Sequence, residues 1–381
     1  MSKALRSSIR KKRIIPISLP DISGNERKYL NECIDSGWIS SAGEFVSRFE
    51  RKFAAFCRQP FGVAVSNGTA ALHLALRAID IGPEHEVIVP ALTFASTVNA
   101  VLYQRARPVF IDCQKDSWNM DVQQFADLIS HRTMAIIPVH LYGLPCEMAS
   151  ILSIAQAKGI AVIEDCAEAH GATYQGKPVG SFGLVGCFSF YGNKIITTGE
   201  GGMCITADPS LNRRMRILRD HGMSRKQRYW HEEVGFNYRM TNLQGAIGCA
   251  QLERIDTFLE KRRWIKKQYN AGLAGLECTL PDDDPIADAT LWLYTFLLPQ
   301  GTKAVQRDQL IAYLAKHQIE SRPIFYPMPE MPPYQEFSRP APNAASISER
   351  GISLPSFYSL TEEDIRRVTE SVRTWFDRGN L

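Results

Sequence analysis

One lysine has surroundings that could turn its side chain into a nucleophile. Lys194 lies between an apolar strand pattern that ends near Phe190 and the glycine-rich turn Gly199-Glu200-Gly201-Gly202. A lysine amine reacts only after it has lost its proton, and burial beside apolar groups lowers its pKa toward that state. A solvated lysine in an ordinary turn is the competing interpretation, and this segment alone supports both about equally.

A carboxylate and a helix start are two further features that could take part in chemistry. Asp165 follows the apolar run 160–163, and a carboxylate at the end of a buried strand needs a partner. That partner is either a structural cation or the cationic nitrogen of a cofactor. Gly68 and Thr69 follow another strand pattern and open a helix. Such a helix start either binds an anion through its backbone N–H groups or is a plain helix cap.

The elements that must position these residues alternate between strand and helix patterns. Short apolar runs predict strands at 62–65, 86–89, 108–111, 134–139, 160–164, 185–190 and 203–205. Helical patterns fall between or after them, at 69–78, 95–103, 121–129, 148–158 and 209–219. This alternation predicts an α/β fold with a mostly parallel central sheet and helices on both faces. Ligands of such sheets bind at the carboxyl ends of the strands, where the unusual residues fall.

The two ends of the chain predict additional parts. Helices are expected at 24–36 and 44–56, the second with a stripe of four phenylalanines at helical spacing. A helical stretch, continuous or broken, covers 242–273. It is followed by a strand at 291–298, a helix at 305–316, a proline-rich loop at 323–333 and a final helix at 361–378. We therefore expect a basic tail at 1–14, a large domain at 15–255 and a smaller α+β domain at 256–381.

Composition excludes several classes of protein. The chain has 381 residues, of which 45% are apolar and 22% charged, as is usual for globular proteins. The net charge of +4 is mild, and much of it lies in the basic run 6–13, so nucleic acid is not the expected partner. Nine scattered cysteines without a CxxC pair indicate reduced thiols in a cytoplasmic protein and no metal site. We expect no signal peptide and no membrane span.

Seven motifs together resemble the sugar aminotransferases of the DegT/StrS type. They are SNGTAAL at 66–72, PALTFAST at 90–97, HLYG at 140–143, IEDCAEAHGA at 163–172, SFYGNK at 189–194, GEGG at 199–202 and GFNYRM at 235–240. The resemblance covers nearly the whole chain from about residue 15. It implies the aspartate aminotransferase-like fold (fold type I) and the cofactor pyridoxal 5'-phosphate (PLP), which becomes pyridoxamine 5'-phosphate (PMP) during the reaction. Segments 38–50, 189–203, 235–242 and 321–328 look closest to the subgroup that forms GDP-perosamine.

The resemblance implies roles around the cofactor ring. Lys194 would bind the cofactor covalently and then move a proton as general base and acid. Asp165 would pair with the pyridine nitrogen and keep it protonated, which makes the ring an electron sink. Phe94 would stack on one face of the ring. Glu168 would lie beside it, where many relatives carry glutamine.

It also implies a phosphate site that two subunits share. Gly68, Thr69 and Ser189 would hold the phosphate through backbone N–H groups and hydroxyls. Asn237 would reach it from a neighbouring subunit, so that the active sites would require a homodimer.

The substrates implied by the resemblance are L-glutamate and a keto sugar nucleotide, used in ping-pong order. The most specific expectation is amination of GDP-4-keto-6-deoxy-D-mannose to GDP-perosamine, for O-antigen polysaccharide. A diphosphate needs cations, for which we consider Arg228, Arg239 and Arg322, although each could be a structural ion pair. His140 and Tyr142 end a strand and are expected near the sugar, with local hydrogen bonding as the alternative.

One residue departs from the perosamine-type pattern. His170 stands where those relatives tend to carry an aliphatic residue, and it resembles relatives that aminate 3-keto sugars. A dTDP- or UDP-linked sugar, or amination at C3, therefore stays an alternative, while a purely structural His170 is the interpretation that we favour.

Two rival functions are disfavoured by the same motifs. A dehydratase of this family would carry histidine in place of Lys194. A non-catalytic regulator that binds PLP and touches nucleic acid would not need Lys194, Asp165 and Asn237 together.

Overall fold

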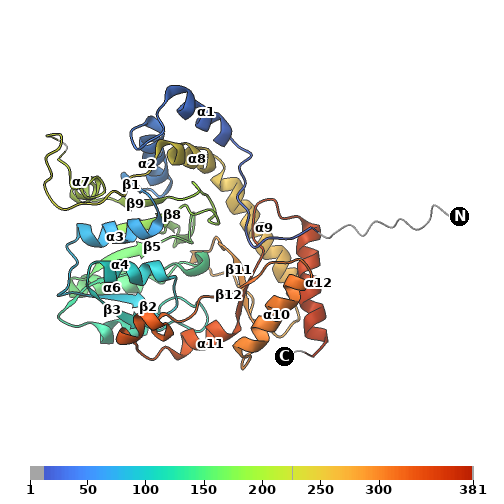
Figure 1. Cartoon of the computed structure of the whole chain (residues 1–381). Coiled ribbons are helices and arrows are strands. Elements are labelled where there is room, and N and C mark those ends of the chain that lie inside the picture. Colours follow the sequence, from blue (N-terminus) through green and yellow to red (C-terminus); the bar gives the residue numbers. More distant parts are fainter. Residues whose placement is uncertain (1–12, 225, 380–381) are drawn as a thin grey trace.

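The computed structural model describes residues 13–224 and 226–379, so most of the predicted basic tail (residues 1–12) lies outside the described residues. Within this described part, a seven-stranded sheet has the order β1-β9-β8-β5-β4-β2-β3 (Figure 1). Its strands are β1 (Phe61–Val65), β2 (Glu86–Pro90), β3 (Arg107–Ile111), β4 (Thr133–Ile136), β5 (Ala161–Asp165), β8 (Val185–Ser189) and β9 (Gly202–Thr206). Neighbouring strands are parallel except at β9, which is antiparallel to β1 and β8. The predicted α/β fold with a mostly parallel sheet is confirmed.

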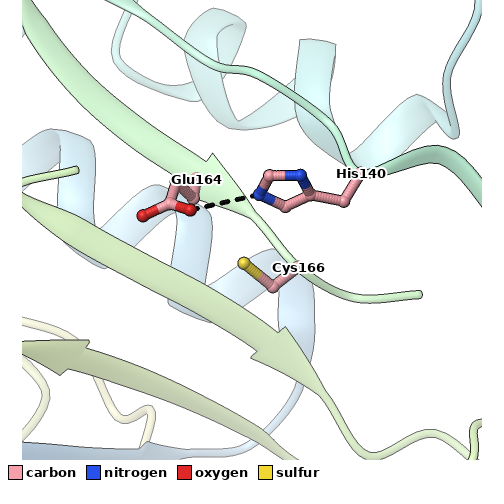
Figure 2. Close-up of side chains that lie close together, drawn as sticks. All are labelled: His140, Glu164 and Cys166. Carbon is pink, nitrogen blue, oxygen red and sulfur yellow. Dashed lines mark hydrogen bonds and ion pairs between the residues drawn. The ribbon is translucent and has the colours of Figure 1, made fainter. Parts of the chain in front are cut away.

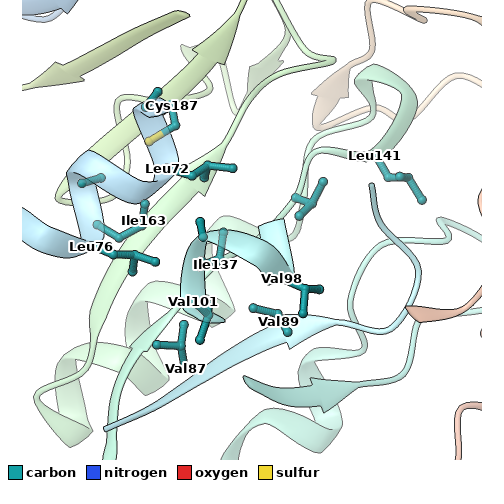
Figure 3. Packing of buried hydrophobic residues seen from close by; sticks show 14 of the residues in the cluster. Leu72, Leu76, Val87, Val89, Val98, Val101, Ile137, Leu141, Ile163 and Cys187 are labelled. Carbon is teal, nitrogen blue, oxygen red and sulfur yellow. The ribbon is translucent and has the colours of Figure 1, made fainter. Parts of the chain in front are cut away.

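Alternate residues of each central strand pack on opposite faces of the sheet, as the period of two requires. On one face, Val87 and Val89 join Leu72 and Leu76 in the cluster that Figure 3 shows. Helices α3 (Gly68–Ala78), α4 (Ala95–Tyr103) and α7 (Pro209–Leu218) cover this face. Ile88, between the two valines, packs on the opposite face in a different cluster.

The opposite face is covered by two groups of helices. Helices α1 (Glu26–Ser36), α2 (Glu44–Phe56) and α8 (Asn242–Leu252) form a cluster with β1, β8 and β9. Short helices α5 (Val122–Phe125) and η1 (Ala126–Leu128), together with α6 (Met148–Lys158), pack toward β4 and β5. The phenylalanine stripe of α2 lies in the first of these clusters, as its spacing predicted.

A second sheet among the described residues has three strands in the order β11-β13-β12. These strands are β11 (Tyr294–Leu297), β12 (Arg322–Pro323) and β13 (Gly351–Leu354). Helices α9 (Ile255–Leu273), α10 (Ala304–Lys316) and α12 (Glu362–Asp377) pack with it, to one side of the large sheet in Figure 1. Ile15 also packs in this cluster and bridges Ile319, so the start of the described chain contacts the C-terminal part. The division into domains at 255/256 stays a prediction.

Several elements differ from those expected. The stretch 242–273 is two helices, α8 and α9, and the strand predicted at 291–298 begins only at Tyr294. The proline-rich loop contains the short helices η3 (Met328–Glu330) and η4 (Pro332–Phe337). Elements that were not predicted are the helices η2 (Leu141–Gly143) and α11 (Pro342–Arg350), the strands β12 and β13, and the small strands β6 (Thr173–Tyr174), β7 (Lys177–Pro178) and β10 (Ala287–Asp288). Among the described helices, we find none that combines the length and apolar character needed to span a bilayer.

Candidate active site

A cavity of about 680 Å³ opens at the carboxyl ends of β1, β5 and β8. This is the position at which open α/β sheets bind their ligands. Eight residues that the motifs singled out line it together: Gly68, Thr69, Phe94, Asp165, Glu168, Ser189, Lys194 and Arg322. They come from segments up to 254 residues apart in sequence, between Gly68 and Arg322, and the fold alone brings them into one place.

The amino end of α3 forms one wall of the cavity. Asn67 caps the helix, because its side chain accepts a hydrogen bond from the Ala70 N–H at 2.8 Å. Gly68 is required by close approach, since a Cβ at this position would lie 2.7 Å from the Cβ of Ser189. The helix start can thus approach the end of β8, and its free N–H groups together with the hydroxyls of Thr69 and Ser189 suit a phosphate.

Asp165 ends β5 and is nearly fully buried. Its carboxylate accepts hydrogen bonds from the Thr97 hydroxyl at 2.7 Å and from the Ala167 N–H at 3.1 Å. Burial raises the pKa of Asp165, while these two hydrogen bonds and the Lys194 ammonium oppose the shift. A buried carboxylate held in this way is suited to a cationic ring nitrogen.

A hydrogen-bond network below Asp165 holds the end of β5 in place. His140 Nε2 lies 3.1 Å from Glu164 Oε2, and the dashed line in Figure 2 marks this contact. Since His140 Nδ1 accepts the Cys146 N–H, the proton of the neutral ring is on Nε2 and is donated to Glu164. Glu164 also accepts three backbone N–H groups of segment 180–183. Cys166 lies beside this pair, but the ligand atoms of His140 and Glu164 already serve these hydrogen bonds.

The amine of Lys194 lies close to a carboxylate and to an aromatic ring. Its Nζ is 3.6 Å from Glu168 Oε1 and 3.7 Å from the centre of the Trp292 ring. Burial lowers the pKa of Lys194, and the carboxylates of Glu168 and Asp165 oppose this shift. Burial likewise raises the pKa of Glu168, against the attraction of Lys194 and the Tyr142 N–H, which donates to Glu168 Oε2 at 2.8 Å. The amine is therefore closer to neutrality than a solvated lysine would be.

Of the residues expected near the sugar or its diphosphate, some line the cavity and others do not. Arg322 lines the cavity, whereas Arg228 is exposed outside it and stacks over Tyr229. Tyr142 stands behind the lining, where its hydroxyl accepts the Phe325 N–H. His140 is fully buried and does not line the cavity, and both of its ring nitrogens are used by the network around Glu164, which agrees with the alternative of local hydrogen bonding.

Two other expected residues lie outside the lining of this chain's cavity. Asn237 is exposed and accepts a hydrogen bond from Arg239, which also pairs with Asp220. His170 is fully buried and contacts the rings of Phe53, Phe188 and Phe190. Burial lowers the pKa of His170 to about 3, so it is a neutral core residue.

A model of the DegT/DnrJ/EryC1/StrS aminotransferase family matches residues 20–373. The chain belongs to this family. It is 48% identical over 360 residues to the GDP-perosamine synthase of Caulobacter vibrioides, covering 93% of this chain and 96% of the relative. It is 43% identical over 362 residues to the GDP-perosamine synthase of Escherichia coli O157:H7, covering 95% and 98%. The solved PLP form of Spr1654 from Streptococcus pneumoniae is similar with a TM-score of 0.91 and 29% identity, covering 97% of this chain and 100% of that one. The chain is thus a PLP-dependent aminotransferase, as its motifs predicted.

The cavity of this aminotransferase fits the cofactor on its own chemistry. The close contact between Gly68 and Ser189, which we call the phosphate cradle, has no room for a Cβ at position 68. The buried Asp165 and Lys194 line the same cavity. Sequence reasoning gave no role to Thr97, Trp292 or Phe325. Thr97 is the last residue of the motif PALTFAST at 90–97. Its spacing of four residues from Thr93, whose hydroxyl it contacts, was the one sign of a role. Trp292 and Phe325 lie in the C-terminal part of the chain, and no local pattern ties them to Lys194.

Proposed function

We propose that this aminotransferase transfers the amino group of L-glutamate to GDP-4-keto-6-deoxy-D-mannose and forms GDP-perosamine. The observation that carries the proposal is the near full-length similarity, at 43–48% identity, to two relatives named GDP-perosamine synthase. A cavity in which the largely buried Lys194 lies 3.6 Å from Glu168, with Asp165 in the same lining, supports it. We place the reaction in the cytoplasm and in O-antigen polysaccharide synthesis.

Lys194 would carry out the proton transfers. When bound, PLP supplies a carbonyl group that exchanges amino groups and a ring that takes up electron density. Because burial lowers the pKa of Lys194, its Nζ can accept a proton from the donor carbon and return it to the cofactor carbon. Glu168, at 3.6 Å, would stabilise the ammonium form in between. In the second half of the cycle, Nζ would move the proton in the opposite direction.

The remaining residues of the cavity would hold the cofactor. Asp165 would pair with the ring nitrogen, and its hydrogen bond from Thr97 fixes the carboxylate for this contact. Phe94, an exposed residue that lines the cavity, would stack on the cofactor ring. Gly68, Thr69 and Ser189 would bind the phosphate.

Arg322 would anchor the anionic part of both substrates. Among the described residues that line the cavity, it is the one arginine; the other basic side chains there are Lys194, whose pKa burial lowers, and His73, whose pKa burial lowers to about 4. L-glutamate brings carboxylates and the sugar nucleotide brings a diphosphate, and both bind in turn in the same cavity. A guanidinium matches either group with paired hydrogen bonds. Phe325 lies beside it in the lining and offers apolar surface to a deoxysugar.

We propose that the enzyme works as a homodimer in which Asn237 completes the cavity of the partner subunit. Asn237 is exposed and lies outside its own cavity, and exposed aromatic residues Tyr229 and Trp230 lie in the same segment. Mixing Lys194→Ala and Asn237→Ala subunits tests this arrangement. If the sites are shared, one site of each mixed dimer lacks both residues and the other is intact, so activity returns. Unshared sites would leave the mixture inactive.

Two steps test the function itself. Borohydride reduction of the yellow holoenzyme should fix the cofactor on Lys194, as peptide mass spectrometry would show. The enzyme with L-glutamate should then be offered GDP-, dTDP- and UDP-linked keto sugars, and the product's amino position should be determined by NMR. We expect turnover of the GDP-linked 4-keto sugar. Turnover only of a dTDP- or UDP-linked sugar, or amination at C3, would replace the perosamine assignment while leaving the aminotransferase intact.

A further inference from the structure

We propose that Trp292 is a positioning residue that holds the free amine of Lys194 and sets its proton affinity while the lysine is not bonded to the cofactor. The inference rests on Lys194 being the reacting amine, as proposed above. It goes further, because it assigns a task to a residue outside the motifs that carry the cofactor site.

The face of the Trp292 ring lies close to the lysine amine. Lys194 Nζ lies 3.7 Å from the ring centre, well within the roughly 6 Å over which a cation is attracted to an aromatic face. Trp292 is 5% exposed, so water weakens this attraction little. An indole face stabilises the ammonium form of lysine more than the amine form. Trp292 therefore opposes the burial that pushes Lys194 toward neutrality.

Three hydrogen bonds fix the ring in this orientation. The indole N–H donates to the backbone oxygen of Asn193, the residue before the lysine, at 2.7 Å. The backbone N–H of Trp292 donates to the Tyr142 oxygen at 3.0 Å, and its own oxygen accepts from the Arg262 side chain at 2.8 Å. Tyr142 also stacks on the ring, with centroids 5.9 Å apart and 17° between the planes. The indole N–H thus ties the ring to the backbone next to the lysine.

Other charged groups also face Lys194 and must stay constant in a test. These are Asp165 at the end of β5 and Glu168 in the segment after it. The neutral His170 of the same segment feels the charge of Lys194. On the other side, a small pocket that Lys194 also lines contains Asp21 and Arg262. Asp21 is paired with Arg254. A substitution at Trp292 alters none of these side chains, so a change in the titration of Lys194 would report the ring.

The test measures the titration of Lys194 in full-length protein loaded with PMP, in which the lysine is free. Trace labelling with acetic anhydride across a pH series, followed by peptide mass spectrometry, gives the midpoint at which Lys194 loses its proton. Trp292→Leu keeps the wall apolar but removes the ring, and we expect the midpoint to fall by about one pH unit. Trp292→Phe keeps a weaker aromatic face, and we expect a fall of roughly half a unit or less.

The chain offers a matched control. Trp264 lies 3.5 Å from Lys261 Nζ in a similar stack that belongs to α9, and Trp264→Leu should leave the midpoint of Lys194 unchanged. A midpoint that is unchanged or raised in Trp292→Leu would overturn the proposal. Should that variant fail to fold, an unchanged or raised midpoint in Trp292→Phe would do the same. Because PMP is added directly, the result is independent of which sugar the enzyme aminates, and borohydride labelling separately tests whether Lys194 is the reacting amine.

Discussion

Substituting Gly68 by alanine tests whether the contact between α3 and β8 is a phosphate cradle. The added Cβ would lie 2.7 Å from the Ser189 Cβ, 3.2 Å from its Oγ and 3.3 Å from its Cα. Restoring an ordinary carbon contact requires Ser189 to retreat by roughly 0.7 Å. Ser189 ends β8 and is buried, so the shift strains the sheet and moves the hydroxyl away from the phosphate.

Two magnitudes follow from this geometry. Overpacking a close contact costs about 1–3 kcal/mol, which lowers the melting temperature of a cofactor-free protein of this length by ~1–4 °C. Losing one hydrogen bond to a charged phosphate costs about 1.5–3 kcal/mol, so the Kd should rise about 10- to 150-fold. PMP is the ligand to titrate, by absorbance or calorimetry, because it makes no covalent bond to Lys194. Gly82→Ala is the matched control, since nothing lies within 4 Å of its Cβ position. Equal PMP affinity in Gly68→Ala and Gly82→Ala would refute the cradle.

Three further variants test the charges of the cavity. Because burial raises the pKa of Asp165, its contribution to stability is complete below its unfolded pKa and is lost as pH rises through its folded pKa. Between about pH 4 and pH 7, the melting temperature of cofactor-free Asp165→Asn should therefore fall less than that of the cofactor-free wild type. An equal fall in both proteins would contradict this reasoning. Glu168→Gln removes the carboxylate 3.6 Å from Lys194 Nζ, and the labelling midpoint of Lys194 should fall by about one pH unit or more. Arg322→Met should raise the KM for both L-glutamate and the sugar nucleotide by about tenfold or more each, and two unchanged KM values would exclude it as the anion anchor.

The elements of the large sheet could be predicted because their signals are local. The phenylalanine stripe predicted a helix at 44–56, and α2 spans Glu44–Phe56. The predicted strands of the large sheet lie within a few residues of the observed ones, because apolar runs buried on both faces alternate with helices. The roles of Asp165 and Lys194 could be suggested from position alone, since each follows a strand at the edge where such sheets bind ligands.

The strand pattern at 291–298 shows where local signals fail. Its first residues are apolar like the rest, yet Leu291 has a φ of 42° and the N–H of Trp292 bonds to Tyr142 instead of joining β11. A tertiary hydrogen bond thus overrides the strand propensity of this run. Likewise, β13 has four residues and pairs with β11 and β12, which lie 28 or more residues away at their nearest ends, so its partners are not visible locally.

Both β11 and β13 lie in the C-terminal part of the chain, which also lines the cavity. Asp165, Glu168 and Lys194 come from β5, β8 and the loops after them, whose order along the chain already predicts that they meet. Trp292 lies just before β11, and Arg322 is the first residue of β12. Both line the cavity because the C-terminal part of the chain packs against the large sheet. Asp165, Glu168 and Lys194 would act on the cofactor, whereas Trp292 would tune the lysine and Arg322 would hold the substrate anions. A sequence motif can therefore identify the cofactor chemistry of this enzyme, whereas the acidity of Lys194 and the choice of substrate depend on how the C-terminal part packs against the large sheet.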